Sequence, residues 1–281
     1  MRPIARGVTM VDQAVVEPTD DPALAAPAPP GLPDESSVAG PRGGELVRRH
    51  RLSTRLWHWA NALALFIMLM SGMMIFNAHP HLYWGEFGAN RDHPWLTLGT
   101  GHLDAFPSWA TIPSSYSLAD ARIWHLAFAW IVLVGGPLYL LWSLANGHLW
   151  RDLVFRASEL RPAHIWHDIA EHARLRFPTG AAALHYNVLQ KGAYLGVLLV
   201  LLPLIILTGL AMAPGADAAL HVSALFGGRQ SARSVHFIVA AAFAAFIVVH
   251  LVMVVLAGPF NEVRSMVTGW YRLPRERGER A

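Results

Sequence analysis

Two histidines interrupt a long apolar stretch near the end of the chain, over residues 233–256 (RSVHFIVAAAFAAFIVVHLVMVVL). The stretch contains no Gly or Pro, which predicts a membrane-spanning helix. His236 and His250 are fourteen residues apart, so they lie about 21 Å apart along a helix and leave within roughly 40° of the same face. Polar rings are costly in hydrocarbon and mark functional sites there. The pair predicts two stacked haems with one axial ligand each from this helix; the alternative is hydrogen bonding to neighbouring helices.

The composition is that of a membrane protein with short polar connections. Of 281 residues, 54% are hydrophobic and only 15% are charged. The chain has no cysteine, which excludes a Cys-ligated iron–sulfur cluster, a Cys-attached c-type haem and a thiol nucleophile within it. The basic residues flank apolar segments instead of forming a groove, so we expect them to set topology, with no nucleic-acid partner.

The apolar segments predict an all-α membrane protein built as a four-transmembrane-helix bundle. Four segments are long enough to span a bilayer: residues 56–76, 121–145, 186–212 and 234–257. They form one predicted domain over residues 46–272. A Pro/Ala-rich arm over residues 1–45 precedes it and is expected to be disordered. A basic tail over residues 273–281 follows it.

Arginines are distributed unevenly among the connections. They cluster just before the first span, in the second loop and in the tail, whereas the first and third loops carry few. The positive-inside rule therefore places both termini in the cytoplasm. Within the second loop, Pro162 is at the expected start of a short amphipathic helix on the membrane surface.

Topology pairs the histidines that lie inside the spans. The start of helix one and the later half of helix four both lie toward the cytoplasm, so His58 can face His250. The starts of helices two and four both lie on the outer side, so His125 can face His236. Two bis-histidine sites result, one in each leaflet, with no intramembrane histidine left over. Bis-histidine ligation leaves no open coordination position, so such haems carry electrons instead of activating oxygen.

Arginine and glycine recur around these histidines. An arginine three positions earlier lies on the same helix face, one turn nearer the water, where it can pair with a haem propionate. Ordinary snorkelling explains each arginine equally well. The arginine–histidine pairs are Arg55 with His58, Arg122 with His125, and Arg233 with His236.

Gly72 lies fourteen residues after His58, at the height of the outer site.

At this point the chain resembles prokaryotic di-haem cytochrome b561-type subunits, which include the membrane cytochrome b subunits of nickel–iron hydrogenases, formate dehydrogenase and thiosulfate reductase. The resemblance rests on the four histidines and on WHW at 57–59, LYWGE at 82–86 and YNVLQK at 186–191. It implies two b-type haems, a quinone site, a multi-pass location in the bacterial inner membrane, and an outer-face partner subunit of molybdopterin or iron–sulfur type. The proline-rich arm and the histidine-rich first loop are not part of the family pattern.

A quinone is the expected redox partner of the inner haem. Asn187 and Gln190 share a helix face with Lys191 adjacent, at the cytoplasmic start of the third span. Amides can donate to a quinone carbonyl and accept from a quinol hydroxyl, whereas lysine only donates. The alternative is that the two amides cap the helix while Lys191 follows the positive-inside rule.

Three functions fit these features. The preferred one is an electron-transfer subunit linking the quinone pool to an outer-face enzyme that docks on the loops over residues 77–119 and 220–230. The second is a self-contained quinone-coupled enzyme, such as a superoxide oxidase. The third is a haem-free membrane anchor.

Overall fold

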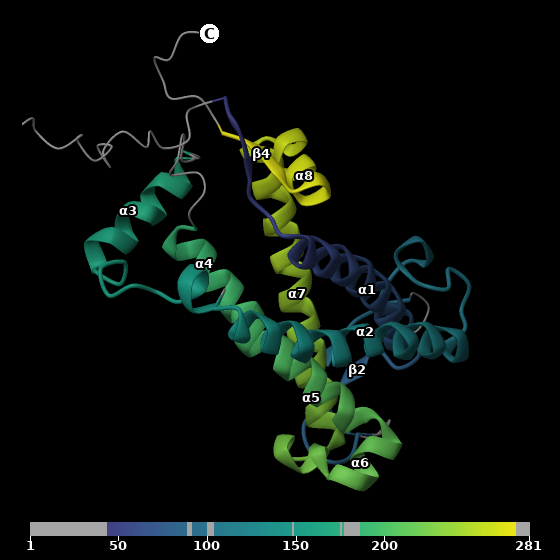
Figure 1. The fold of residues 1–281 in the computed structure, drawn as a ribbon. Helices are drawn as coiled ribbons and strands as arrows, with labels where there is room; N and C mark the ends of the chain where they lie inside the picture. Colours follow the sequence, from purple (N-terminus) through teal and green to yellow (C-terminus); the bar gives the residue numbers. More distant parts are fainter. Residues whose placement is uncertain are drawn as a thin grey trace, which may run out of the picture. The chain divides into compact units, whose positions relative to one another are not determined.

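The computed structural model describes residues 44–88, 92–99, 104–147, 149–174, 176 and 186–273. The predictions for the N-terminal arm and the basic tail therefore fall almost wholly outside the described residues. Four helices of the described part are long and apolar enough to cross a membrane, which confirms the predicted all-α, four-span architecture (Figure 1). The spans are α1 (Leu52–Asn77), α2 (Leu118–Ala145), a composite third span (Val188–Met212) and α7 (Arg229–Ala257).

The third span changes its hydrogen-bond pattern half-way along. It consists of α4 (Val188–Gly196), a π-helical segment (Val197–Leu201) and α5 (Leu202–Met212). Pro203 is the second residue of α5, two positions after the end of this segment. Proline has no N–H to donate and its ring crowds the carbonyl four residues earlier. The wider π turn before Pro203 accommodates that missing bond without ending the span.

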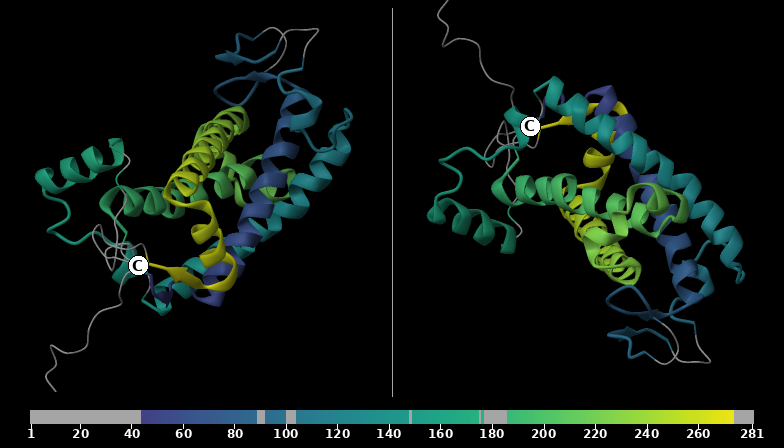
Figure 2. Two further views of the ribbon diagram at one scale, coloured as in Figure 1. Left: turned by 90° about the horizontal axis from the view of Figure 1, so that it is seen from above. Right: turned by 90° about the horizontal axis from the view of Figure 1, so that it is seen from below.

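The spans pack in two pairs, and both views in Figure 2 show α1 and α2 side by side. α5 packs on α7 through a cluster of Ile205, Val239 and Phe243. Away from these interfaces the apolar side chains face outward: Leu141 is 62% exposed and Val248 is 62% exposed. Such exposure over whole helices fits a lipid surrounding, because lipid tails cover apolar side chains that water would not.

The ends of the domain meet in a small sheet. Strand β1 (Leu46–Arg48) pairs antiparallel with β4 (Trp270–Arg272), and Val47 lies opposite Tyr271. Between α7 and β4 lies α8 (Pro259–Thr268), and Figure 1 shows α8 and β4 together at one end of α7. The start of α1 and the end of α7 therefore lie at the same end of the molecule. We call it the cytoplasmic end, after the topology predicted from the distribution of arginines. Neither this sheet nor α8 was predicted from the sequence.

The opposite, outer end is built from the first and third loops. Its regular elements are β2 (His81–Leu82), β3 (Leu96–Thr97), a 3₁₀ turn (Ser108–Ala110), α6 (Pro214–Leu220) and a second 3₁₀ turn (Val222–Phe226). Gly228 has φ of 119°, and a Cβ there would lie 2.6 Å from Glu86 Cα. Only glycine allows this approach. The first loop is thus attached to the start of α7. Between α2 and α4 lie a π-helical segment (Leu149–Leu153) and α3 (Pro162–Ala173), which begins at the expected Pro162.

Candidate haem site

The four intramembrane histidines lie in two facing pairs. His58 on α1 faces His250 on α7, with ring centroids 6.2 Å apart and planes inclined by 55°. His125 on α2 faces His236 on α7, with centroids 6.3 Å apart and planes inclined by 60°. We call these the inner pair and the outer pair. Because α7 supplies one ring to each, the two pairs are stacked along a single helix.

Both separations match two imidazoles that share one metal. A metal–imidazole bond is about 2.0–2.1 Å, and a ring nitrogen lies about 1.1 Å from its ring centre. Two such rings on opposite sides of one metal have centroids about 6.2–6.4 Å apart, using that bond length. The observed 6.2 and 6.3 Å fall within this interval. The donor set therefore fits a bis-histidine haem in each position.

The ring of His125 has a defined tautomer. Its Nδ1 lies 3.1 Å from the backbone carbonyl of Met68 and 3.1 Å from Ser71 Oγ. A carbonyl can only accept, so Nδ1 carries the proton. The Ser71 hydroxyl donates to the carbonyl of Ile67 at 2.7 Å, which leaves its oxygen free to accept as well. Nε2 of His125 is then unprotonated, as a metal ligand must be.

His236 is held in the same way from α5. Its Nδ1 lies 2.9 Å from Thr208 Oγ1, and that hydroxyl donates to the carbonyl of Leu204 at 2.6 Å. The hydroxyl hydrogen is thus used, so the imidazole must be the donor. Sequence reasoning did not single out Ser71 or Thr208. The available signal was a lone hydroxyl residue inside an otherwise apolar span.

The inner pair is bounded by aromatic rings. His58 Nδ1 is buried and has no hydrogen-bond partner among the described residues. The His58 ring meets Trp59 edge-on at 5.1 Å, and His250 stacks on Phe246 at 6.0 Å. A buried ring nitrogen without a partner is costly. A metal bound through Nε2 would leave this Nδ1 without an acceptor, unlike the Nδ1 atoms of the outer pair.

Two glycines leave room beside the outer rings. A Cβ at Gly72 would lie 3.5 Å from Cε1 of His125, and one at Gly209 would lie 3.7 Å from Cε1 of His236. Gly72 is therefore at the level of the outer pair, as its spacing predicted. Gly135 leaves room for the Trp57 ring and not for a histidine, because a Cβ there would come within 2.4 Å of Trp57.

The three predicted propionate partners differ in their surroundings. Arg233 donates to the backbone carbonyls of His81 at 2.7 Å and His79 at 2.5 Å, which ties the first loop to α7. Arg55 donates to the carbonyl of Val267, while its Nε is buried and has no partner among the described residues. Arg122 is exposed. Arg55 thus has a donor to spare, and the propionate role of all three stays a prediction.

Comparison with known proteins decides the family. The model of the prokaryotic cytochrome b561 family matches residues 49–269, which is most of the chain. The chain belongs to this family. As a cytochrome b561-type protein it is a membrane electron-transfer subunit of a haem b family.

Curated relatives of this cytochrome agree with that placement. A protein of Azospira oryzae named "Putative protein-methionine-sulfoxide reductase subunit YedZ1" is 31% identical over 75% of this chain and 92% of its own length. The "Putative cytochrome YdhU" of Escherichia coli is 28% identical over 82% and 76%. The "Probable Ni/Fe-hydrogenase B-type cytochrome subunit" of Cupriavidus necator is 24% identical over 84% and 91%. No solved structure matches the chain.

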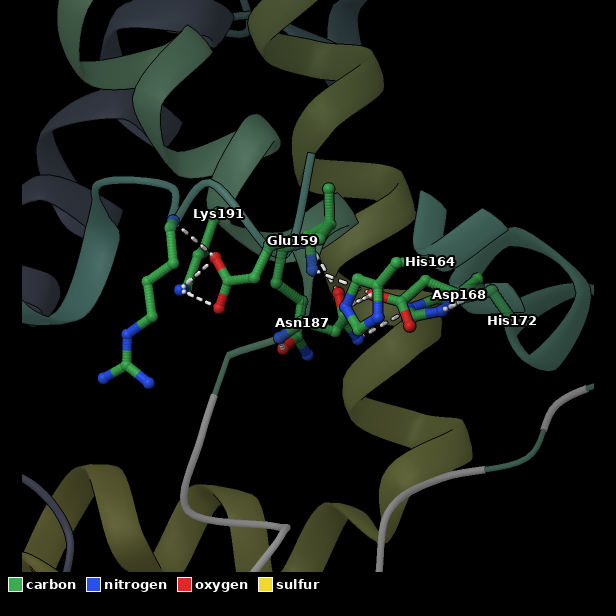
Figure 3. A network of polar contacts seen from close by, with 9 residues as sticks. Glu159, His164, Asp168, His172, Asn187 and Lys191 are labelled. Carbon is green, nitrogen blue, oxygen red and sulfur yellow. Dashed lines mark hydrogen bonds and ion pairs between the residues drawn. The ribbon is translucent and has the colours of Figure 1, made fainter. Parts of the chain in front are cut away.

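The residues predicted to contact quinone hold the start of the cytochrome's third span. Asn187 and Gln190 form a reciprocal capping box: the Asn187 side chain accepts from the Gln190 N–H at 2.8 Å, and Gln190 Oε1 accepts from the Asn187 N–H at 3.2 Å. Lys191 Nζ donates to both oxygens of Glu159 at 2.8 Å (Figure 3). The capping alternative is thus present in the structure, and quinone contact stays a prediction.

Proposed function

We propose that the chain holds two b-type haems, one between His58 and His250 and the other between His125 and His236. The observation that carries the proposal is the pair of centroid distances, 6.2 and 6.3 Å, each of which fits one shared metal. When bound, a bis-histidine haem supplies one-electron transfer. The two histidines of each pair would hold the haem and leave no position for another ligand, and Ser71 and Thr208 keep the outer rings in the metal-binding tautomer.

Haem counts in single-histidine variants test this assignment. The wild-type protein should carry two haems per chain by pyridine haemochrome assay. His58→Leu and His250→Leu should each leave the outer haem, and His125→Leu and His236→Leu should each leave the inner one. The reduced-minus-oxidised spectra of the first two variants should then match each other and differ from those of the last two. Two haems retained in any variant would contradict the pairing.

The proposed role is electron transfer across the bacterial inner membrane, between the quinone pool and an oxidoreductase on the outer face. Two irons held by one helix fourteen residues apart lie about 21 Å from each other, across most of a bilayer about 30 Å thick. Support for a partner enzyme comes from two relatives whose names describe a subunit of a methionine-sulfoxide reductase and a subunit of a nickel–iron hydrogenase. We propose a partner of molybdopterin or iron–sulfur type.

We place partner docking at the outer end. Phe87 in the first loop is 82% exposed and Leu225 in the third loop is 75% exposed. Large exposed apolar side chains on loops near a redox centre mark an interaction surface. Phe87→Ser with Leu225→Ser should release the partner in pull-down while leaving the haem spectrum intact. The matched control is Phe260→Ser, which removes a 91% exposed side chain at the cytoplasmic end. Equal partner binding by the wild type, the double variant and the control would show that the docking surface lies elsewhere.

We place the quinone at the cytoplasmic end, where Asn187, Gln190 and Lys191 open the third span. Variants must separate the capping role of Asn187 from ligand binding. Asn187→Ser keeps a side-chain acceptor for the cap but removes the amide donor. If the amide contacts quinol, Asn187→Ser slows quinol-dependent haem reduction in protein that keeps both haems and its thermal stability. Wild-type rates would leave Asn187 as a cap alone.

A further inference from the structure

We propose that a basic pocket at the cytoplasmic end binds the phosphate headgroup of an anionic phospholipid. The pocket is a cavity of about 560 Å³ between the start of α1, the end of α2 and the connection that follows α2. Its site is distinct from both histidine pairs, none of whose residues line it. The cations that line it come from two separate segments of the chain: Arg49, Arg51, Arg151 and Arg156.

The charge of this pocket is poorly balanced by the protein. No Asp or Glu is among the described residues that line it. Arg49 is offset by Glu262 at 3.2 Å, outside the lining. Arg151 uses one N–H on the carbonyl of Asn146 at 3.1 Å. Glu159, also outside the lining, accepts from the backbone N–H of Arg156 at 3.0 Å. Four guanidinium groups around a cavity whose described lining holds no carboxylate are suited to a phosphate.

A second observation points to a ligand in the same cavity. Ser143 lines the pocket, is 1% exposed, and its Oγ has no hydrogen-bond partner among the described residues. Serines inside helices normally bond a carbonyl one turn earlier. A buried hydroxyl left unpaired is costly, and a phosphate oxygen would accept its hydrogen. The arginines supply the charge of an anion site, and Ser143 supplies the neutral donor.

The position of the pocket selects a lipid as the source of that phosphate. The pocket lies where α1 begins and α2 ends, so it meets the predicted membrane surface. Trp142 and Trp150 line it and are 55% and 63% exposed, as expected of tryptophans at headgroup depth. Leu138 and Leu141, on the last turns of α2, are 60% and 62% exposed and offer an apolar path for acyl chains. Basic pockets at the cytoplasmic side of membrane helices bind such headgroups.

The test uses the full haem-loaded protein in detergent and phosphatidylglycerol as the probe, with phosphatidylcholine as the neutral lipid. Native mass spectrometry should show phosphatidylglycerol retained on the wild type in preference to phosphatidylcholine. Arg151→Gln with Arg156→Gln should weaken retention roughly 30-fold, at about fivefold for each charge lost near the membrane surface. The matched control, Arg161→Gln with Arg174→Gln, removes two exposed arginines of the α3 region and should retain the lipid.

Ser143→Ala distinguishes binding from a structural role. Removing an unpaired buried hydroxyl should not destabilise the lipid-free protein, but it should reduce the rise in thermal midpoint that phosphatidylglycerol gives. Equal retention of the two lipids, or equal losses in the pocket and control variants, would overturn the proposal. So would full competition by millimolar inorganic phosphate, which indicates a soluble anion site. A haem deficit in the Arg151/Arg156 variant would also overturn it, because the pocket would then serve a haem propionate.

Discussion

The two histidine pairs have nearly equal ring separations but different surroundings. In the outer pair, each Nδ1 is fixed by a hydroxyl that is itself bonded to the backbone, through Ser71 for His125 and Thr208 for His236. In the inner pair, His58 Nδ1 is buried without a partner among the described residues, and aromatic rings surround it. The outer rings are therefore held in their ligand geometry by hydrogen bonds from the protein, whereas His58 of the inner pair has no such anchor on Nδ1 among the described residues.

This difference has a consequence for the electronic properties of the two sites. A ligating imidazole that donates its other N–H is a more basic ligand and stabilises the oxidised metal. The outer haem is accordingly expected to have the lower reduction potential of the two, so a redox titration should resolve two steps with the inner haem reduced first. The two halves of α7 thus each carry one histidine, but His236 contacts the Thr208 hydroxyl whereas His250 stacks on Phe246.

The largest effect should come from filling the space beside the outer pair. Gly209→Val would push a branched side chain toward His236, where even a Cβ would lie 3.7 Å from the ring. We expect the outer haem to be lost and the inner haem to remain, giving about one haem per chain by the pyridine haemochrome assay. Gly196→Val is the matched control on the same span, because nothing lies within 4 Å of a Cβ there. Two haems in both variants would show that the outer pair does not need this space.

A smaller effect is expected when one anchor of the outer pair is removed. Thr208→Val keeps the shape of the side chain but removes the oxygen that accepts from His236 Nδ1. Loss of such an outer-shell partner typically weakens metal affinity about 10–100-fold. The outer haem should therefore dissociate faster into a haem acceptor and titrate at a higher potential. The inner haem is the internal control. Equal shifts in both haems would remove the proposed contrast between the pairs.

At the cytoplasmic end, the start of the third span carries an ion pair between Lys191 and Glu159. The side chain of Lys191 is 6% exposed and that of Glu159 is 19% exposed. Lys191→Met therefore leaves the Glu159 carboxylate partly buried and without its cation. The expected loss is about 2 kcal/mol, below the 3–5 kcal/mol of a fully buried pair. The double variant Lys191→Met/Glu159→Gln should recover part of it in thermal unfolding. Both haem spectra should persist; a missing inner haem would mean that this pair positions the inner site.

Much of the site follows from the sequence because helical spacing is regular. The fourteen-residue interval on α7 and the alternating direction of the spans are enough to bring His58 near His250 and His125 near His236. Gly72 beside His125 follows from the same spacing. These relations depend on helix geometry alone, which varies little between apolar sequences.

Other features depend on contacts between distant segments and could not be read from spacing. Arg233 was interpreted as a propionate partner or a snorkelling side chain, yet its guanidinium donates to the carbonyls of His79 and His81, in a loop about 150 positions earlier. The strand pair that joins Val47 to Tyr271 has no local signal, because three-residue strands lack a measurable period. The anchoring hydroxyl of Thr208 also emerges only when α5 is packed on α7.

The smallest effect concerns a half-buried carboxylate of α6, in the third loop. Asp217 accepts hydrogen bonds from Ser223 N at 2.7 Å and Ser223 Oγ at 2.8 Å. These bonds hold the pKa of the Asp217 carboxyl below its ordinary value, and the bond from the Ser223 backbone N–H has the larger effect. A lowered pKa means that the unfolded loop binds the proton more tightly. The stabilisation is therefore complete above the ordinary pKa and is lost as the pH falls through the lower folded value.

Asp217→Asn should remove most of this pH dependence, since an amide has one acceptor oxygen and no charge. Hydrogen exchange at the Ser223 amide should be slower in the wild type than in the variant at pH 7, and the difference should vanish well below pH 4, where the wild-type carboxylate is protonated. Because the outer pair is anchored inside the spans by Ser71 and Thr208, neither haem spectrum should change as this loop loosens. A shift confined to the outer haem would show that the loop, as well as the two hydroxyls, sets the geometry of that pair.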